Sequence, residues 1–180
     1  MIAIVAVSPS WGIGRSGGLL YSLKEDMRFF RRTTLGKTVI CGRKTLESFP
    51  GGRPLPNRRT IVISRNPFYR PEGAEVVRSP REALALVEGL PKDEVFVIGG
   101  GEIYRQMLPY CDTALVTRVD REPEEAPEIF FPDLEKEEGW TLTEASEPLT
   151  EGEFSYRFCR YEQKKAEEKE LSQPQPEESK

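Results

Sequence analysis

The sequence predicts a single α/β domain: a central, mostly parallel sheet with crossover helices on both faces and an antiparallel strand pair toward the C-terminus. Three observations favour this fold. Apolar runs of strand length recur along the chain, and helical patterns separate most of them. Two longer segments of alternating polarity lie toward the C-terminus. The length of 180 residues suits one domain with one core.

The first part of the chain predicts a strand, a loop and a helix. Ile2 to Val7 is a continuous apolar run, which is typical of a strand buried on both faces. Residues 8–23 contain four glycines and are expected to form a loop. Lys24 to Thr34 is expected to be helical, because Met27 and Phe30 lie at helical spacing.

Three more strands and a short helix are predicted next. Lys37 to Cys41 is a second buried strand, and Arg43 to Ser48 forms a short helix. The Pro- and Gly-rich segment PGGRPLPNRR then leads to a strand at Thr60 to Ser64. Glu75 to Val77 is expected to add a short strand.

A capping box opens the following helix. Ser79-Pro80-Arg81-Glu82 combines a hydroxyl cap, a proline at the first helical position and an acid three residues after the cap. The helix is expected to run to about Glu88 and to precede a buried strand at Glu94 to Ile98. Three glycines then lead into a helix at Glu102 to Leu108.

The remaining segments predict a strand and an antiparallel pair. Thr113 to Val119 is the strand, and an acidic loop follows at 122–128. Trp140 to Glu147 and Phe154 to Tyr161 alternate in polarity, and a turn around Thr150 to Gly152 joins them.

The end of the chain has a different composition. From Lys164 to Lys180 the single large apolar residue is Leu171, which buries too little surface to offset the entropy of ordering. We therefore expect a folded domain over residues 1–162 and a disordered charged tail over 163–180.

Charge and residue usage argue against several classes of partner. The net charge is −4 with no basic stripe, so we expect no nucleic-acid partner. No apolar run approaches the roughly 20 residues that span a bilayer, and the first residues lack the basic segment of a signal peptide. We therefore expect no membrane partner.

The absence of histidine and the spacing of the cysteines narrow the chemistry. Without histidine, the chain has no Ser-His-Asp or Cys-His catalytic set and no His-ligated metal. Cys41, Cys111 and Cys159 are far apart and form no CxxC pair. We therefore expect no metal site, reduced thiols and a cytoplasmic location.

Gly12 to Gly17 matches the GxGxxG pattern but does not indicate a Rossmann fold. That fold requires a helix to open within the glycines and an acid about 20 residues further on. Here an extended or looped segment follows, so a flexible loop is the structural interpretation. A long glycine-bearing loop is also typical of an active-site lid.

Glycines and basic residues follow three predicted strands. Gly99–Gly101 lies between a strand and a helix, where backbone N–H groups can approach a pyrophosphate; a tight turn is the alternative. Gly42–Thr45 places a basic first turn after another strand, and Ser64 and Arg65 end a third. Each alone is typical of a solvated surface, but together they favour a pocket for a 2′-phosphate.

Asp26 and Arg58 are the charged residues that we expect in a site. Asp26 shares the apolar face of its helix with Phe30, and a buried carboxylate needs hydrogen-bond donors or a proton. A ligand with an amidine-like edge would supply two such bonds, although an acid that merely favours the helix dipole is the alternative. Arg58 is either an exposed loop residue or a clamp on a substrate carboxylate.

Nine segments together, in their order and spacing, resemble dihydrofolate reductase of the bacterial chromosomal type: IAIVAV, WGIG, LKEDMRFFR, GRKTLES, GRPLPNR, IVIS, VIGGGEIY, LVTRVD and FFPD. The resemblance covers about residues 1–162. It implies NADPH-dependent reduction of 7,8-dihydrofolate to 5,6,7,8-tetrahydrofolate, which supports one-carbon metabolism and thymidylate synthesis. It also implies NADPH as the cofactor, dihydrofolate and antifolate inhibitors as partners, and a monomer.

The resemblance implies roles for individual residues. Asp26 would hold pterin N3 and the 2-amino group and would favour protonation of N5 through a water. Thr117 would hydrogen-bond Asp26, Tyr21 would complete the catalytic set, and Arg58 would bind the glutamate α-carboxylate. The implied substrate-binding residues are Val5, Ala6, Asp26, Met27, Phe30, Phe49, Arg53, Leu55, Arg58, Ile98 and Thr117.

The resemblance likewise implies a cofactor site. The loop from Trp11 to Leu20 would be a mobile lid over the nicotinamide, and the Gly99–Gly100 peptide would be cis. The implied cofactor-binding residues are Ala6, Val7, Ile13, Gly14, Arg15, Gly17, Gly18, Leu19, Arg43, Lys44, Thr45, Ser64, Arg65, Ile98, Gly99, Gly100, Gly101, Glu102, Ile103 and Tyr104.

The sequence departs from the family pattern in four features. Leu20-Tyr21 replaces the usual Pro-Trp, and Lys24 stands where proline is common. Glu102 replaces a residue that is frequently basic. Glu128 lies near the usual aspartate of the loop that latches the lid.

Two alternatives to this function remain open. A related NADPH-dependent reductase of the riboflavin pathway shares the fold, but Asp26, Phe30 and Arg58 fit a pterin with a glutamate tail better. A non-catalytic nucleotide-binding relative is the second, and the intact Asp26 argues against it. Of the three functions, dihydrofolate reduction is the one for which we expect an antifolate to bind.

Overall fold

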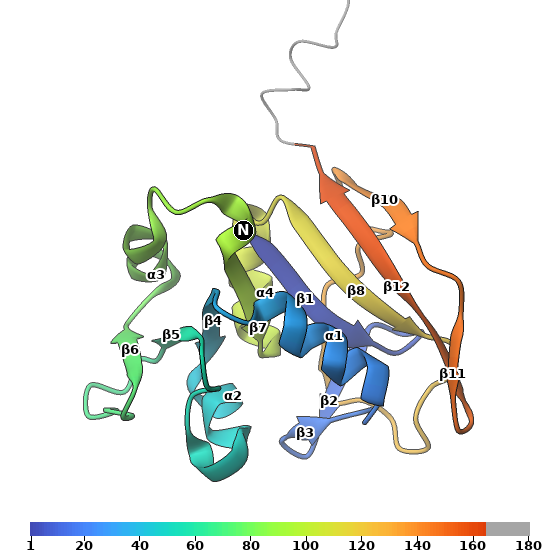
Figure 1. Ribbon diagram of the computed structural model, residues 1–180, viewed down its shortest axis with the longest axis horizontal. Helices are drawn as coiled ribbons and strands as arrows, with labels where there is room; N and C mark the ends of the chain where they lie inside the picture. The colour runs from blue at the N-terminus through green and yellow to red at the C-terminus, as the bar shows by residue number, and fades with distance from the viewer. Residues whose placement is uncertain (165–180) are drawn as a thin grey trace, which may run out of the picture.

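The computed structural model describes residues 1–164, which form one sheet flanked by helices on both faces (Figure 1). The strands of the main sheet are, in spatial order, β10 (Trp140–Ala145), β12 (Phe154–Gln163), β8 (Thr113–Val119), β1 (Ile2–Val7), β7 (Val95–Gly99), β4 (Thr38–Gly42), β5 (Arg59–Ile63) and β6 (Ala74–Val77). The six strands from β8 to β6 run parallel to one another. Strand β12 runs antiparallel to β8, and both β10 and the short β11 (Leu149–Glu151) pair with β12.

The strand order places a topological switch beside β1. The chain leaves β1, crosses to β4, and returns later to insert β7 between them. It then adds β8 on the other side of β1. Ligands of open α/β sheets bind at the carboxyl ends of strands at such a switch, so this edge is where a site is expected.

Four α-helices cover the sheet. Helices α1 (Lys24–Thr34) and α2 (Arg43–Ser48) pack on one face, and α3 (Pro80–Val87) and α4 (Gly101–Met107) pack on the other. Figure 1 shows α1 in front of the sheet and α4 behind it. Single 3₁₀ turns occur at Pro50–Gly52, Lys92–Glu94 and Leu108–Tyr110.

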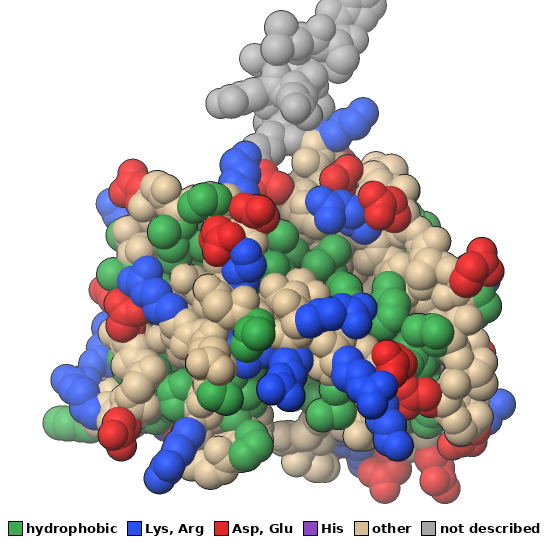
Figure 2. All heavy atoms as spheres, viewed as in Figure 1, with side chains coloured by type: hydrophobic (Ala, Val, Ile, Leu, Met, Phe, Trp, Pro, Cys, Tyr) green, Lys and Arg blue, Asp and Glu red, His purple; other side chains and the backbone are tan. Residues whose placement is uncertain are grey.

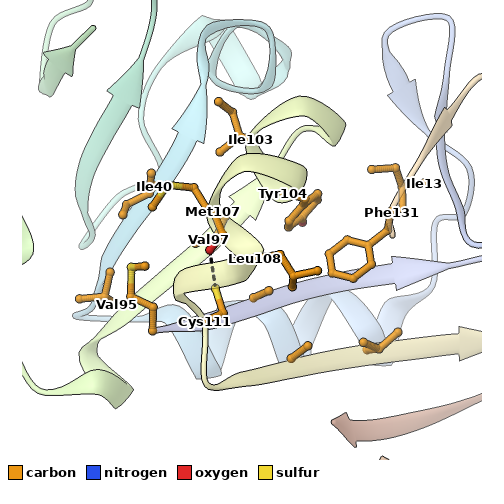
Figure 3. Packing of buried hydrophobic residues seen from close by; sticks show 14 of the residues in the cluster. Ile13, Ile40, Val95, Val97, Ile103, Tyr104, Met107, Leu108, Cys111 and Phe131 are labelled. Carbon is orange, nitrogen blue, oxygen red and sulfur yellow. Dashed lines mark hydrogen bonds between the residues drawn. The ribbon is translucent and has the colours of Figure 1, made fainter. Parts of the chain in front are cut away.

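The apolar core is divided between the two faces. On the α4 side, the packing includes Tyr104, Met107 and Phe131, which Figure 3 shows against the strand residues. The Cys111 thiol donates a weak hydrogen bond to the Met107 carbonyl over 3.5 Å. On the α1 side, Leu46 of α2 packs against the buried strand residues that face the α1 side of the sheet. The strands are therefore buried on both faces, as their continuous apolar runs predicted.

The segment 8–23, predicted to be a loop, contains a second small sheet. Strand β2 (Gly12–Arg15) pairs with β3 (Gly18–Leu19) and with β9 (Ile129–Phe130). Ser16 and Gly17 join β2 to β3 with φ of 50° and 76°, the positive values of a tight hairpin turn. The GxGxxG pattern is thus part of a hairpin and not of a dinucleotide-binding turn.

Other expected boundaries moved by one or a few residues. Strand β7 extends to Gly99, and α4 begins at Gly101. Strand β12 extends to Gln163, and the Lys164 N–H donates to the Gly139 carbonyl. The tail expected over 163–180 lies, from residue 165 on, outside the described residues. No helix within residues 1–164 has the length and apolar character needed to cross a bilayer.

Candidate active site

The site is built around the carboxyl group of Asp26, in the first turn of α1. The Thr117 hydroxyl of β8 donates a hydrogen bond to Asp26 Oδ1 over 2.6 Å, the contact that the resemblance implied. Ala6 of β1 is paired in register with Thr117. Residues from α1, β1 and β8 therefore meet at the carboxyl ends of the two strands.

The environment of Asp26 favours its protonated form. Burial raises the pKa of Asp26, and the nearby Glu151 carboxylate raises it further. The hydrogen bond from Thr117 acts in the opposite direction and stabilises the anion. Asp26 is thus a half-buried acid with a raised pKa, which is typical of carboxyl groups in functional sites.

An apolar wall lies beside Asp26. Phe30 of α1, Phe49 after α2 and Ile98 of β7 belong to one packed cluster on this face of the sheet. Leu55 is half-buried, whereas the Met27 side chain, also of α1, is 58% exposed. Figure 2 shows this face, where the surface is hollowed between α2 and the β2–β3 hairpin, below α1.

Arg58 links the 50–58 loop to the end of α1. Its guanidinium donates to the carbonyls of Pro56, at 2.7 Å, and Arg31, at 3.0 Å, and to the Thr34 hydroxyl at 3.2 Å. Burial and the nearby Arg31 cation lower the pKa of Arg58. Arg31 is exposed, as is Arg53. The contacts hold the Arg58 fork in place on a face where α1 also exposes arginines (Figure 2).

The three glycines at the junction of β7 and α4 are required by their surroundings: Gly99, the last residue of β7, has a φ of 119°, and Gly100 and Gly101 are closely packed. The Gly99–Gly100 peptide is cis. A Cβ at Gly100 would lie 3.3 Å from Thr45 Oγ1, and a Cβ at Gly101 would lie 2.5 Å from Cγ2 of Ile129. The start of α4 therefore sits against both α2 and β9, and no side chain caps its first N–H groups. These donors are the groups that a pyrophosphate would accept from.

The basic residues predicted for an adenosine phosphate lie at strand ends on the same side. Arg43 and Lys44 open α2, whose first turn contains no acid. Ser64 and Arg65 follow β5; Ser64 is buried and Arg65 is exposed. The spatial neighbour of β5 is β6, so the residue that follows β6 also belongs to this edge.

That residue is Arg78, which our sequence analysis did not select. Its guanidinium donates to the backbone carbonyls of Ser64, Asn66 and Pro67 over 3.2, 2.6 and 3.2 Å. Arg78 thereby fixes the loop that follows β5. A basic residue directly after a predicted short strand was the available signal, and it resembled an ordinary surface charge.

The β2–β3 hairpin is held by the acidic loop over residues 122–128. Arg15 of β2 donates to the Glu125 carboxylate over 2.6 Å and to the Ala126 carbonyl over 2.7 Å, and Glu128 lies 3.3 Å away. Glu128 also accepts from the Ser16 N–H over 3.1 Å. The Arg15 guanidinium therefore faces the acidic loop.

The other residues of the β2–β3 hairpin differ in exposure. Ile13 and Gly14 of β2 are buried, whereas Gly17, Gly18 and Leu19 are exposed. Leu19 is 84% exposed at the edge of the hairpin. The apolar side chain of Leu19, in β3, thus lies outside the protein core.

Tyr21 and Tyr104 are both anchored by backbone carbonyls. The Tyr21 hydroxyl donates to Arg121 over 2.6 Å, and burial, with the charges of Glu122 and Asp120, raises the pKa of Tyr21 to about 12. The Tyr104 hydroxyl donates to the Ile4 carbonyl over 2.6 Å, and complete burial raises its pKa. Both hydroxyls are therefore neutral near pH 7 and act as donors.

The remaining predicted site residues occupy the strand ends and the start of α4. Val5 is half-buried and Val7 is fully buried in β1, and Ile103 is buried in α4. Glu102 is exposed and pairs with Arg105 over 2.5 Å. Its charge is thus compensated within α4.

A second concave region lies at the opposite ends of the parallel strands. A cavity of about 820 Å³ is lined by residues that include Met1, Leu84 and Tyr110, next to the amino ends of the parallel strands. It contains none of the predicted site residues. Within residues 1–164, no group of three or more His, Cys, Asp or Glu side chains could hold a metal ion.

Comparison with known proteins extends these observations to a family. The family model described as dihydrofolate reductase matches residues 1–163. The dihydrofolate reductase of Bacillus subtilis is 37% identical over 164 residues, which cover 89% of this chain and 93% of the relative. That of Mycobacterium leprae is 45% identical over 118 residues, covering 65% and 70% of the two chains.

A solved structure has the same fold. The dihydrofolate reductase from Enterococcus faecalis, complexed with NADP(H) and RAB-propyl, matches with a TM-score of 0.80 and 32% identity. The match covers 91% of this chain and 96% of that one. With the family model matching over nearly all of the described residues, the chain belongs to the dihydrofolate reductase family.

Proposed function

We propose that this protein reduces 7,8-dihydrofolate to 5,6,7,8-tetrahydrofolate with NADPH. The observation that carries the proposal is the Asp26 carboxyl, held by Thr117 beside an apolar wall at the carboxyl ends of β1 and β8. Family membership supports the same reaction. NADPH, when bound, supplies the hydride that the ring receives at C6.

Asp26 binds the polar edge of the pterin and favours a proton at N5. The N3–H and 2-amino group of the ring are parallel donors, and a carboxylate accepts two such bonds. The raised pKa of Asp26 lets its carboxyl hold a proton at a higher pH than an ordinary aspartate does, and Thr117 orients the carboxyl. Asp26 therefore combines binding of the substrate with control of its protonation.

The apolar wall and Arg58 bind the rest of the substrate. Phe30, Phe49 and Leu55 supply flat, water-excluding surface for the pterin and benzoyl rings. Arg58 carries a fixed planar fork that suits the glutamate α-carboxylate. Antifolates that carry the same polar edge are expected to use the same residues.

The residues present fit NADPH. The close packing at Gly100 and Gly101 leaves backbone N–H groups at the start of α4 without a side chain in front of them, which suits the pyrophosphate. Arg43, Lys44 and Arg65 supply cations for the 2′-phosphate, and Arg78 holds the loop that carries Arg65. The β2–β3 hairpin serves as the lid over the nicotinamide.

Three further features complete the proposal. Residues 1–162 form the catalytic domain, which works as a monomer in the cytoplasm. The three cysteines are free and buried, which suits a reducing compartment. A one-domain fold in which a single chain carries every proposed site residue supports the monomer.

The test is the loss of NADPH absorbance when dihydrofolate is added to the purified protein. We expect rapid loss, much slower with NADH because the 2′-phosphate is then missing. If NADPH binds but no loss follows, the proposed reaction is wrong. Tight binding of an antifolate then separates a damaged dihydrofolate reductase from a riboflavin-type reductase, which is expected not to bind it.

A further inference from the structure

The helix that carries Asp26 begins without a cap of its own. Leu23 occupies the N-cap position of α1 and has no side-chain oxygen to accept from the first N–H groups. A helix start of this kind leaves backbone donors unsatisfied unless another segment supplies an acceptor. In α1 these donors lie immediately before Asp26.

The acceptor comes from the far end of the chain. Glu151 of β11 accepts from the Lys24 N–H over 2.8 Å with Oε2 and from the Glu25 N–H over 2.9 Å with Oε1. One carboxylate thus satisfies the first two donors of α1 across 127 and 126 residues of sequence. Both oxygens are used, so the carboxylate is fixed in orientation.

Glu151 is itself anchored from β12. The Tyr156 hydroxyl donates to Glu151 Oε1 over 2.8 Å, and Tyr156 is 1% exposed. Glu151 and Phe154 are paired in the tight β11–β12 hairpin. The position of Glu151 is therefore set by the edge of the main sheet, and not by α1.

Several charged or titratable groups face Asp26 or Glu151. Lys24 and Glu25 lie on α1, where Glu25 also pairs with Arg28. Tyr156 of β12 and Tyr104 of α4 are close enough for the charge of Asp26 to raise their pKa values. The backbone donors lower the pKa of Glu151, whereas burial raises that of Asp26, so the two shifts favour a charged Glu151 next to a protonated Asp26.

We infer that Glu151 is a positioning residue for the reduction: it fixes the start of α1 and places a constant negative charge beside Asp26. The charge makes Asp26 harder to ionise and also favours a positive charge on the nearby pterin. Both effects move the protonation step to higher pH. This inference rests on the proposed function for its catalytic consequence.

The test separates the charge of Glu151 from its size. Glu151→Gln keeps an oxygen that can accept one backbone bond, and Glu151→Ala removes both bonds. Glu147→Gln is the matched control, because Glu147 is exposed in the connection before β11 and carries the same charge. We would measure kcat and KM against pH, and separately the Asp26 titration by carboxyl-carbon NMR, with Asp26→Asn to assign the signal.

In Glu151→Gln we expect the Asp26 titration and the kcat profile to move to lower pH. Above the midpoint kcat should fall about threefold, whereas at low pH it should equal that of the wild type. The KM for NADPH should not change, and Glu147→Gln should overlay the wild type. Glu151→Ala should move the profile in the same direction and in addition speed amide exchange at Lys24 and Glu25.

Other outcomes are decisive in different ways. If both Glu151 variants overlay the wild-type titration and kcat profile, Glu151 is a structural cap alone and the inference is wrong. If the wild type has no turnover but the Asp26 titration still moves in Glu151→Gln, the proposed function is wrong, while the effect of Glu151 on Asp26 is supported.

Discussion

The Asp26 carboxyl meets two opposing requirements. The proposed function needs it inside the site, where it would bind the pterin, but burial disfavours its charged form and raises its pKa. A raised pKa means that the folded protein binds this proton more tightly than the unfolded chain does. The contribution of Asp26 to stability is therefore greatest below its ordinary pKa and is lost as the pH rises through the raised value.

Replacing Asp26 with Asn should lower turnover and raise the free energy of unfolding. Near neutral pH we expect turnover to fall roughly 100-fold or more, while NADPH binding is retained. The free energy of unfolding in urea should rise by up to about 1 kcal/mol at pH 7, because a buried charge is removed. At a pH below both pKa values the two proteins should unfold alike. Full turnover in the variant would remove Asp26 from the mechanism.

Arg58 allows a separate test of how the substrate tail is bound. Lysine keeps the positive charge but cannot present a planar fork, so Arg58→Lys should raise the KM for dihydrofolate about 10-fold with little change in kcat. A dihydropterin without the glutamate tail should show no such change. An equal loss for both substrates would instead point to the contacts of Arg58 with Arg31 and Thr34 at the end of α1.

At the scale of elements, α3 is capped by Ser79, as the sequence predicted, whereas the second bond of the capping box comes from the residue before the cap. Ser79 Oγ accepts from the Glu82 N–H over 3.2 Å, and the Glu82 carboxylate accepts from the Arg78 N–H over 2.7 Å. Ser79→Ala should lower the free energy of unfolding by about 1 kcal/mol, whereas Ser79→Asp should retain most of it. Urea denaturation measures both, and equal stabilities for the two variants would contradict the role of this cap.

The elements that could be predicted are those with a strong local signal. The apolar run of β1 and the spaced apolar residues of α1 gave the bounds of both elements correctly. The pairing of β2 with β9 could not be predicted, because β2 is glycine-rich and its partner lies more than 100 residues later. Such strands form because the tertiary fold brings them together, and neither has a periodic pattern of its own.

The same limit applies to the site. Asp26 and the glycine turn follow from local pattern and from the resemblance to the family. Glu151 does not, because an acid in a polar hairpin has no sequence signal for a partner on α1. Lys24 is informative only in retrospect: it stands where proline is common in the family, and a proline would lack the N–H that donates to Glu151.

At the scale of the whole molecule, the buried thiols report on global opening. Burial raises the pKa of Cys41 and of Cys111 to about 12, and raises that of Cys159 as well. The folded protein should therefore react slowly with a disulfide reagent, and denaturant should expose all three thiols.

NADPH provides the control for this prediction. At a concentration one hundred times its Kd, NADPH should slow thiol modification by about 100-fold if global unfolding is the route of access. Immediate reaction of one thiol in the native protein would show that its surroundings open locally. NADPH-independent modification of all three would show that the cofactor does not stabilise the fold.

The position of β1 has a consequence for the newly made chain. Its two neighbours in the sheet, β7 and β8, begin at Val95 and Thr113. At a synthesis rate of about 5 to 20 residues per second, the apolar run of β1 waits several seconds or more before either partner leaves the ribosome. During that interval it is an unpaired strand that a chaperone can bind, and that a second nascent chain can capture. Helix α1 remains without an acceptor for its first N–H groups for longer still, because Glu151 is synthesised after both of these strands.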